Sequence, residues 1–314
     1  MDGWELAADG DGVLSMLDLR RAGLATPDIT ALVRAGRLTN LARGWYALGR
    51  PDTAEARHVL TTRAMLRAHM GRAVAGHHSA LLLMGLPTYR ADLSTVRLSR
   101  RTPGSPRTRT GQRLGRAVPP ESQLDLTVVP ALAVVQHGIS AGPLSALVAA
   151  DGLLHRGASA EDLVVALDWV RYHPRTSALR AALPRADGRR ESPGETVLGH
   201  VLHTMNVPVT PQFEITERSF RAVPDFLVDG ENVVIEFDGK IKYGRSAETP
   251  DPFGRKRSPE QVVWDEKRRE DRIREIGYEV VRVTWSDLSN PRELAERIRA
   301  AIARARRRTG RLTA

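Results

Sequence analysis

The chain contains no cysteine among its 314 residues, which excludes disulfide bonds, thiolate zinc sites and a cysteine nucleophile. No apolar run approaches the roughly 18 residues that a membrane-spanning helix requires. The first residues, MDGWE, are acidic, whereas a signal peptide begins with a basic segment. We therefore expect a cytoplasmic protein with neither a signal peptide nor a membrane partner.

Basic residues outnumber acidic residues. The chain has 47 Lys and Arg residues against 37 Asp and Glu residues, which gives a formal net charge of +10. Basic side chains that neutralise phosphates release counterions and so provide sequence-independent affinity for nucleic acid. The excess of basic residues favours a polyanionic partner. The positions at which the arginines cluster are more informative than the net charge.

An Asp-Gly dipeptide marks a hairpin in the C-terminal third of the chain. Asp229 and Gly230 separate two apolar runs of strand length, residues 223–228 and 233–237. Asp-Gly between apolar runs is typical of two antiparallel strands joined by a tight turn. The stretch VPDFLVDGENVVIEFDGK is therefore predicted to form a β-hairpin.

Acidic side chains gather on one face of this hairpin. Because side chains alternate between the faces of a strand, Glu236 and Asp238 lie on the same face as Val234. The opposite face is apolar and comprises Val233, Ile235 and Phe237. The turn also brings Asp225 of the first strand within reach of Glu236, so three carboxylates are expected to converge.

Converging carboxylates need a compensating charge. Two of them about 4 Å apart repel by roughly 4 kcal/mol at an effective dielectric constant near 20. A shared proton would offset this repulsion. More usually, a divalent cation such as Mg²⁺ compensates the negative charge and is bound by carboxylate and phosphate oxygens. The alternative is a surface hairpin whose acidic side chains are solvated.

The order of these residues resembles the core of PD-(D/E)xK nucleases, in the variant found in the very-short-patch-repair (Vsr-like) endonucleases. Pro224-Asp225 is followed by the segment EFDGK, residues 236–240, and then by the helical pattern EKRR, residues 266–269. A final strand follows Gly277-Tyr278, as it does in the family. The resemblance covers roughly residues 192–300.

The resemblance implies a phosphodiesterase site that uses Mg²⁺ or Mn²⁺. Its metal ligands would be Asp225, Glu236 and Asp238. Lys240 or Arg269 would balance the charge of the phosphate. The third position of the motif has two possible assignments. Lys240 fills the lysine position if Asp238 is the preceding acid, whereas Glu236-x-Asp238 fits the Vsr-like variant.

Glu195 has two interpretations. Ser192-x-x-Glu195 is a capping box with proline at the first helical position, and in the first interpretation the glutamate serves only to accept the Ser192 backbone N–H. By the resemblance, Glu195 also occupies the place of the acid on the family's first helix, beside the metal site. The implied catalytic set is Glu195, Asp225, Glu236, Asp238, Lys240 and Arg269.

The N-terminal segment has the pattern of a winged helix-turn-helix. Ser15 is placed to cap a short helix that ends near Gly23, and Thr26-Pro27 opens a second helix that ends at Gly36. Residues 38–48 fit a two-stranded wing. In such a domain the second helix lies in the major groove of DNA. The expected DNA contacts are Thr30, Arg34, Arg37 and Arg43, and the alternative is a winged helix used for protein contacts or dimerisation.

The same segment resembles the N-terminal region of AbiEi-family antitoxins. The resemblance lies in the segment from Gly36-Arg37-Leu38 to Leu48, which contains Arg-Gly-x-Tyr-x-Leu, and in HHSA and GLP, residues 77–80 and 85–87. It extends over roughly the first half of the chain. The family belongs to type IV toxin-antitoxin systems and binds its own promoters, so the resemblance implies DNA binding here.

The middle of the chain carries fewer signals. Residues 96–116 hold seven arginines and no acidic residue, interrupted by proline and glycine. This pattern predicts an exposed basic loop, either in contact with phosphate or inert. His77 and His78 are neighbours that favour a capping or core role. His200 and His203 have chelating spacing, but no third ligand stands out, so we do not predict a zinc site.

The predicted architecture is a multidomain α+β protein. It comprises a winged helix-turn-helix (1–50), a mainly helical AbiEi-like middle region (51–183), a linker (184–191) and a restriction-endonuclease-like α/β domain with a mixed sheet and a basic tail (192–314). The expected function, in a bacterial cytoplasm, is metal-dependent DNA cleavage.

The alternative function is an AbiEi-type antitoxin or transcriptional regulator whose nuclease-fold domain is inactive. In a third reading, this domain serves solely as a dimerisation scaffold. DNA is the expected partner in the first two cases, and a second copy of the chain and a cognate toxin are left open as further partners.

Overall fold

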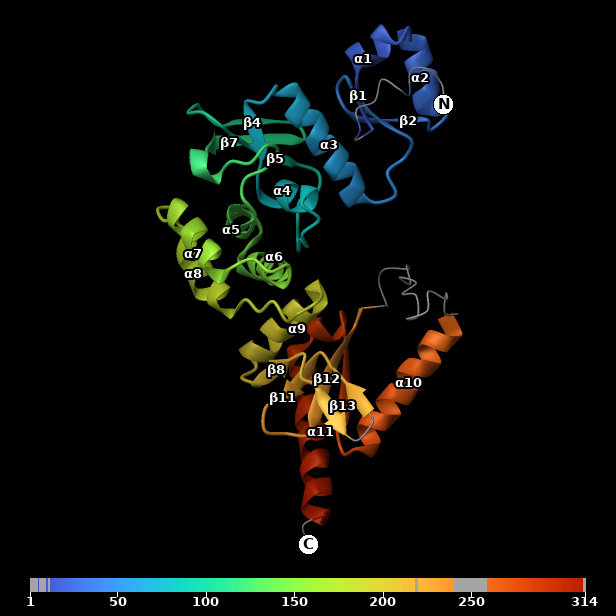
Figure 1. The fold of residues 1–314 in the computed structure, drawn as a ribbon, viewed down its shortest axis with the longest axis vertical. Coiled ribbons are helices and arrows are strands. Elements are labelled where there is room, and N and C mark those ends of the chain that lie inside the picture. The colour runs from blue at the N-terminus through green and yellow to red at the C-terminus, as the bar shows by residue number, and fades with distance from the viewer. Residues whose placement is uncertain (1–4, 6–9, 11, 218–219, 240–258, 313–314) are drawn as a thin grey trace. The chain divides into compact units, whose positions relative to one another are not determined.

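The computed structural model describes residues 5, 10, 12–217, 220–239 and 259–312, and it divides into two compact units (Figure 1). The first unit is Met1–Gly188 and the second is Arg189–Ala314. Both combine helices with sheets, so the chain is a mixed α/β protein. In the parts of the chain that are described, every helix is too short or too polar to cross a membrane.

The N-terminal segment contains both predicted helices and the predicted hairpin. Helix α1 (Met16–Arg21) begins after Ser15, whose hydroxyl accepts the Asp18 N–H at 3.1 Å. Helix α2 (Thr26–Arg34) follows, and strands β2 (Leu38–Ala42) and β3 (Trp45–Leu48) form the hairpin. A strand that was not predicted, β1 (Val13–Ser15), adds to β3 and gives the order β1-β3-β2. The small core comprises Leu14, Leu19, Ile29, Leu38 and Tyr46.

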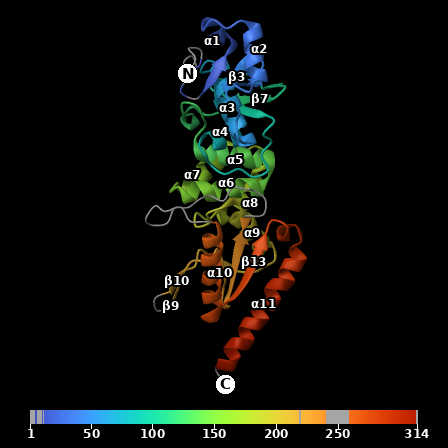
Figure 2. The same ribbon diagram turned by 90° about the vertical axis from the view of Figure 1, so that its right-hand side faces the viewer.

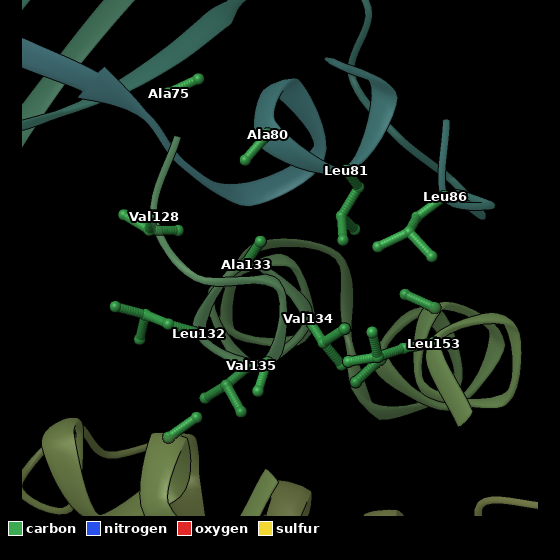
Figure 3. Packing of buried hydrophobic residues seen from close by; sticks show 14 of the residues in the cluster. Ala75, Ala80, Leu81, Leu86, Val128, Leu132, Ala133, Val134, Val135 and Leu153 are labelled. Carbon is green, nitrogen blue, oxygen red and sulfur yellow. The ribbon is translucent and has the colours of Figure 1, made fainter. Parts of the chain in front are cut away.

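The middle of the first unit is organised around helix α5 (Pro130–Ala141). Every residue from Ala131 to Gly138 of this helix is buried, including the polar Gln136 and His137, so the helix is enclosed on all sides. Figure 3 shows its side chains Leu132, Val134 and Val135 pointing in different directions into the same core. The surrounding helices are α3 (Ala54–Ala68), α4 (His77–Leu83), α6 (Pro143–His155), α7 (Ala160–Trp169) and α8 (Thr176–Ala182), with 3₁₀ turns at Pro120–Ser122 and Leu183–Arg185.

The prediction of a basic loop over residues 96–116 was wrong, and the middle region is not helical throughout. Strands β4 (Ala73–Ala75), β5 (Val96–Arg100), β6 (Arg107–Arg109) and β7 (Gln112–Ala117) form a sheet in the order β4-β5-β7-β6. Val96, Leu98 and Leu114 are buried, and most of the arginines on these strands are exposed. The alternation typical of a strand was present, but the density of arginine, proline and glycine concealed it.

Three histidines are buried in the core of the first unit. His78, on α4, is 2% exposed, and its Nε2 lies 3.1 Å from the Thr95 carbonyl. His58 and His137 are also buried, and each has a ring nitrogen next to a backbone carbonyl. The predicted core role is therefore confirmed for His78.

Part of the predicted linker 184–191 is packed against the first unit. The Asp187 N–H donates to Asp151 Oδ1 at 2.8 Å, and the Gly188 carbonyl lies 2.9 Å from His155 Nδ1. The division between the units comes directly after Gly188. The chain thus leaves the first unit in the middle of the predicted linker.

The second unit is built on a four-stranded mixed sheet in the order β13-β12-β11-β8. Strand β12 (Val233–Asp238) pairs in parallel with β13 (Glu279–Thr284) and antiparallel with β11 (Phe226–Val228). Strand β8 (Val209–Pro211) pairs antiparallel with β11 at the edge. Strands β9 (Ile215–Glu217) and β10 (Phe220–Ala222) form a separate hairpin.

Helices cover both faces of this sheet. Helices α9 (Pro193–Thr204) and α11 (Pro291–Leu312) pack on the face that contains Val233 and Ile235, with a 3₁₀ turn at Asp287–Ser289. Helix α10 (Pro259–Glu275) and the β9–β10 hairpin pack on the face of Val234. Figure 2 shows α10 and α11 on either side of the sheet. The predicted alternation along β12 is confirmed, and its acidic residues point toward α10.

Candidate active site

The β11–β12 hairpin brings Asp225 and Glu236 together. Phe226 pairs with Ile235, so one step further in the same register places Asp225 opposite Glu236. Gly230 at the turn has φ +74°, a conformation that glycine adopts without strain. Oδ2 of Asp225 accepts the Phe237 N–H at 2.6 Å, which holds this carboxylate at the carboxyl end of β12.

Glu236 is buried and paired with arginine. Its side chain is on β12, only 7% of the residue is exposed, and its Oε1 lies 2.5 Å from a terminal nitrogen of Arg269 on α10. A second arginine, Arg282 on β13, lies 3.9 Å from Oε2. The predicted approach of Arg269 to the acidic cluster is therefore observed, with Glu236 as its partner.

Arg282 links the remaining acidic residue to the cluster. It is the cross-strand partner of Glu236 in the β12–β13 register, and it lies 3.8 Å from Asp238. Its Nε donates to Glu270 of α10 at 2.8 Å, which fixes the guanidinium between the helix and the sheet. Asp238 thus faces a cation at the end of β12.

Glu195 combines a structural role with a position near the site. Its Oε1 accepts the Ser192 hydroxyl at 2.7 Å, and its Oε2 accepts the Glu191 N–H at 2.9 Å and the Gln212 side-chain amide at 3.2 Å. The capping box predicted that Glu195 accepts the Ser192 backbone N–H, but in the structure it accepts the Glu191 backbone N–H instead. Its carboxylate is also near enough to Asp225 to affect the titration of that group. Both interpretations of Glu195 are compatible with this geometry.

Burial and the neighbouring carboxylates make Asp225 hard to ionise. Burial, together with the negative charges of Glu195 and Glu236, raises the pKa of Asp225 to about 7. The hydrogen bond from the Phe237 N–H and the charge of Arg269 act in the opposite direction and only partly offset these effects. A strongly perturbed carboxyl group next to other charged groups is typical of functional sites, although structural ion pairs produce the same signature.

The fit to a divalent cation rests on two carboxylates. Mg²⁺ commonly takes one or two protein carboxylates and completes its shell with water and phosphate oxygens. Asp225 and Glu236, opposite each other on adjacent strands, fit that requirement. Within the described ranges, however, no group of three or more His, Cys, Asp or Glu side chains is arranged to hold a metal ion. Asp225, Glu236 and Asp238 therefore do not form a preassembled three-ligand set.

Two predicted elements of the site lie outside what the structure describes. Lys240 belongs to the undescribed stretch 240–258. The side chain of Glu266 is also outside the described residues, although its backbone is part of α10. The choice between Asp238 and Lys240 for the third motif position therefore stays open.

Sequence reasoning missed two residues that contact the predicted set. Arg282 had a weak signal, because it is a polar residue between the apolar residues Val281 and Val283 on a predicted strand. Gln212 had no such signal in the sequence, since only the pairing of β8 with β11 brings it next to Glu195. Contacts of this kind depend on strand order, which is not visible in local sequence.

Gly194 allows α9 to approach the sheet beside the site. A Cβ atom at this position would lie 1.9 Å from Cε1 of Phe237, whose ring also meets Trp285 edge-on at 5.1 Å between centroids. The start of α9, and with it Glu195, is therefore positioned by direct contact between the glycine and the aromatic ring.

Gly194→Ala is expected to lower the free energy of unfolding of the second unit by about 1–3 kcal/mol, because the added methyl group overpacks the ring of Phe237. Urea unfolding followed by circular dichroism measures this change. Gly199→Ala in the same helix is the matched control, since its nearest neighbour is the flexible side chain of Arg190 at 3.0 Å. Phe237→Leu should restore part of the loss, and equal effects of the two alanine variants would contradict the proposed contact.

The four predicted DNA contacts do not form one group. Thr30 and Arg34 are exposed and one turn apart on α2, so they share a face of that helix. Arg37 follows the helix and forms an ion pair with Glu5 at 2.8 Å. Arg43, at the turn between β2 and β3, lines a pocket with residues of α3 and of the β6–β7 hairpin.

Comparison of the chain with protein-family models gives no match, and comparison with curated proteins gives no significant match.

Proposed function

We propose that the second unit is a PD-(D/E)xK-like endonuclease domain that hydrolyses DNA with Mg²⁺ or Mn²⁺, and that the N-terminal segment is a winged helix-turn-helix that binds DNA. The observation that carries this proposal is the pair Asp225 and Glu236, which converge from adjacent strands at one end of a mixed sheet. Burial and the neighbouring carboxylates of Glu195 and Glu236 raise the pKa of Asp225 to about 7. The order of residues from Glu195 to Tyr278 supports the same family resemblance.

The residues of the chain have distinct roles in this proposal. Asp225 and Glu236 would hold the cation, Asp225 in its ionised form. Glu195 keeps the site negative and orders the start of α9, and Arg269 balances the charge of the bound phosphate. When bound, a divalent cation would activate water and stabilise the leaving oxygen.

Cleavage of supercoiled plasmid and of single-stranded DNA, with Mg²⁺ or Mn²⁺, tests the proposal. Asp225→Asn and Glu236→Gln are each expected to reduce the cleavage rate by more than about 100-fold, because each removes a charged ligand while preserving shape. Asp229→Asn is the matched control, since Asp229 lies in the turn at the other end of β11 and bonds only with Thr210 among the described side chains. Unchanged cutting by Asp225→Asn would contradict the assignment.

A second candidate is a DNA-binding regulator with an inactive nuclease fold, as in an antitoxin that acts with a cognate toxin or as a homodimer. The ion pairs of Glu236 and Asp238 with Arg269 and Arg282 favour it, because arginines already balance part of the acidic charge. This candidate predicts no cleavage by the wild type on any substrate. It also predicts that binding to the DNA upstream of its own gene is the same for wild type and Asp225→Asn.

A further inference from the structure

An arginine-lined pocket of about 530 Å³ lies in the first unit, separate from the acidic cluster. Its wall is formed by the β2–β3 turn, the C-terminal end of α3, and strands β5, β6 and β7. The arginines that line it are Arg43, Arg72, Arg100, Arg107 and Arg109. None of its lining residues in the described ranges is acidic.

Strand geometry explains why the β6–β7 hairpin contributes two of these arginines. Arg107 pairs with Leu114 and Arg109 pairs with Gln112 in the antiparallel register, and all four residues line the pocket. Thr108 pairs with Arg113 between them, and neither lines it. Because side chains alternate, Arg107 and Arg109 point to the pocket and Arg113 points to the other face of the same hairpin.

The positive charge in the pocket has no acidic partner among the residues that the structure describes. In the part of the chain that the structure describes, none of the five arginines forms an ion pair. Two of them make neutral contacts, since Arg72 Nε donates to the His69 carbonyl at 3.1 Å and Arg100 Nε donates to the Ser105 carbonyl at 3.1 Å. These bonds hold each guanidinium in place by one nitrogen and leave its charge unbalanced.

The arginines of the pocket affect the pKa of His69, which also lines it. Burial lowers the pKa of this histidine, and the charges of Arg72, Arg100 and Arg109 lower it further. Its ring Nε2 lies 2.6 Å from the side-chain amide of Gln112, as expected for a neutral ring that accepts a hydrogen bond. The site therefore combines fixed positive charge with a neutral histidine.

Apolar groups complete the lining. Trp45, Met65 and Leu114 line the same pocket as the arginines. Guanidinium groups bind phosphate oxygens through paired N–H donors. The guanidinium of Arg67 lies over the Trp45 indole at 5.2 Å from the ring centroid, so a base would stack on the part of the ring that Arg67 does not cover. Unbalanced arginines beside an aromatic ring match the two halves of a nucleotide, its phosphate and its base.

We propose that this pocket binds a phosphate-bearing ligand, with the phosphate oxygens held by Arg43, Arg107 and Arg109 and the adjoining base or sugar against Trp45. The ligand is either a segment of a nucleic-acid strand or a free nucleotide, which share this chemistry. The inference goes beyond the proposed nuclease, because it concerns a different unit and needs no divalent cation. It shares Arg43 with the proposed winged-helix DNA contacts, but Arg107 and Arg109 belong to the β6–β7 hairpin, which lies outside that segment.

Binding is tested with the full chain in a metal-free buffer containing a chelator, so that DNA cleavage and the acidic cluster do not contribute. The probes are a fluorescent single-stranded oligonucleotide of about a dozen nucleotides, ATP and inorganic pyrophosphate. Arg109→Gln is compared with Arg113→Gln, which removes the same charge from the same hairpin on the opposite face. Both side chains are exposed, so neither change disturbs the core.

Arg109→Gln is expected to weaken binding about five- to tenfold and to reduce the slope of log K against log salt for the oligonucleotide by about 0.7, whereas Arg113→Gln changes neither appreciably. Competition by ATP or pyrophosphate that depends on Arg109 would identify a free nucleotide as the ligand. If the oligonucleotide binds and neither ATP nor pyrophosphate competes with it, the ligand of the pocket is a nucleic-acid strand.

Two results would overturn the inference. The first is an equal loss of affinity in Arg109→Gln and Arg113→Gln, which would indicate a general effect of net charge. The second is binding of all three probes by the double variant Arg107→Gln/Arg109→Gln with the affinity of the wild type. Neither result bears on the nuclease proposal, whose test is cleavage by Asp225 and Glu236 variants.

Discussion

Asp225→Asn is expected to raise the free energy of unfolding of the second unit by on the order of 4 kcal/mol at pH values above about 8. The pKa of Asp225 is raised from 3.8 to about 7, chiefly by burial and then by Glu195 and Glu236. The folded protein therefore holds this proton more tightly than the unfolded chain, and stability decreases as the pH rises from 3.8 to about 7. Asparagine removes the ionisation, and its amide oxygen still accepts the Phe237 N–H.

Urea unfolding of the wild type and the variant between about pH 5 and pH 9 measures this effect. The difference between them should grow with pH and level off above about pH 8. Asp229→Asn, at the other end of β11, should show no such growth. A variant that is no more stable than the wild type at high pH would show that Asp225 ionises without penalty, and the acidic cluster would then lose its main electrostatic feature.

Under the nuclease proposal, the expected gain in stability and the expected loss of cleavage are two consequences of one arrangement. A carboxylate that is unfavourable in the folded protein is retained at a place where a divalent cation would compensate it. Active sites commonly sacrifice stability in this way. A variant that is both more stable and unable to cut DNA would therefore be the combined outcome that the nuclease proposal predicts.

Acidification is expected to destabilise the first unit strongly. His78 and His137 are 2% and 0% exposed, and burial lowers the pKa of His78 to about 3 and that of His137 to about 4. Because these rings resist protonation when folded, the unfolded chain binds more protons, and stability falls as the pH drops below about 6.5. Each ring contributes about 1.4 kcal/mol per pH unit, so the two together lower stability by on the order of 5 kcal/mol between about pH 6.5 and pH 4.5.

His137→Gln isolates one of these contributions. The Nε2 of His137 lies 3.1 Å from the Tyr89 carbonyl, and a glutamine amide can donate the same hydrogen bond without titrating. The pH dependence of unfolding should become shallower by about 1.4 kcal/mol per pH unit in this range. His173→Gln, which alters an exposed histidine, should leave it unchanged. Identical pH profiles for the wild type and His137→Gln would refute the role of this ring.

The hairpin of β11 and β12 could be predicted because its signals are local. Asp229-Gly230 specifies the turn, and the alternation of Val233, Ile235 and Glu236 specifies the faces. The Ser15 and Ser192 caps are local signals as well, and both helices begin where these residues predict. Each of these features depends on residues a few positions apart, so the sequence alone contains the information.

The sheet of the middle region could not be predicted in the same way. Strands β5 and β7 pair in parallel, and β4 joins β5 from a distant part of the chain. Their alternating apolar residues compete with seven arginines and several turn-forming residues in residues 96–116. Burial against α5 and its neighbours outweighs the local preference for a loop, because it removes Val96, Leu98 and Leu114 from water.

The sequence by itself determined the identity and local spacing of the acidic residues, the helix caps and the basic character of the β6–β7 hairpin. Only the tertiary structure decided which charges meet. It paired Glu236 with Arg269 and Arg282, set Gln212 beside Glu195, and joined Arg43 to the arginines of β6 around a pocket. The physical reason is that Coulomb interactions and burial act between atoms close in space, and strand order brings distant segments to that range.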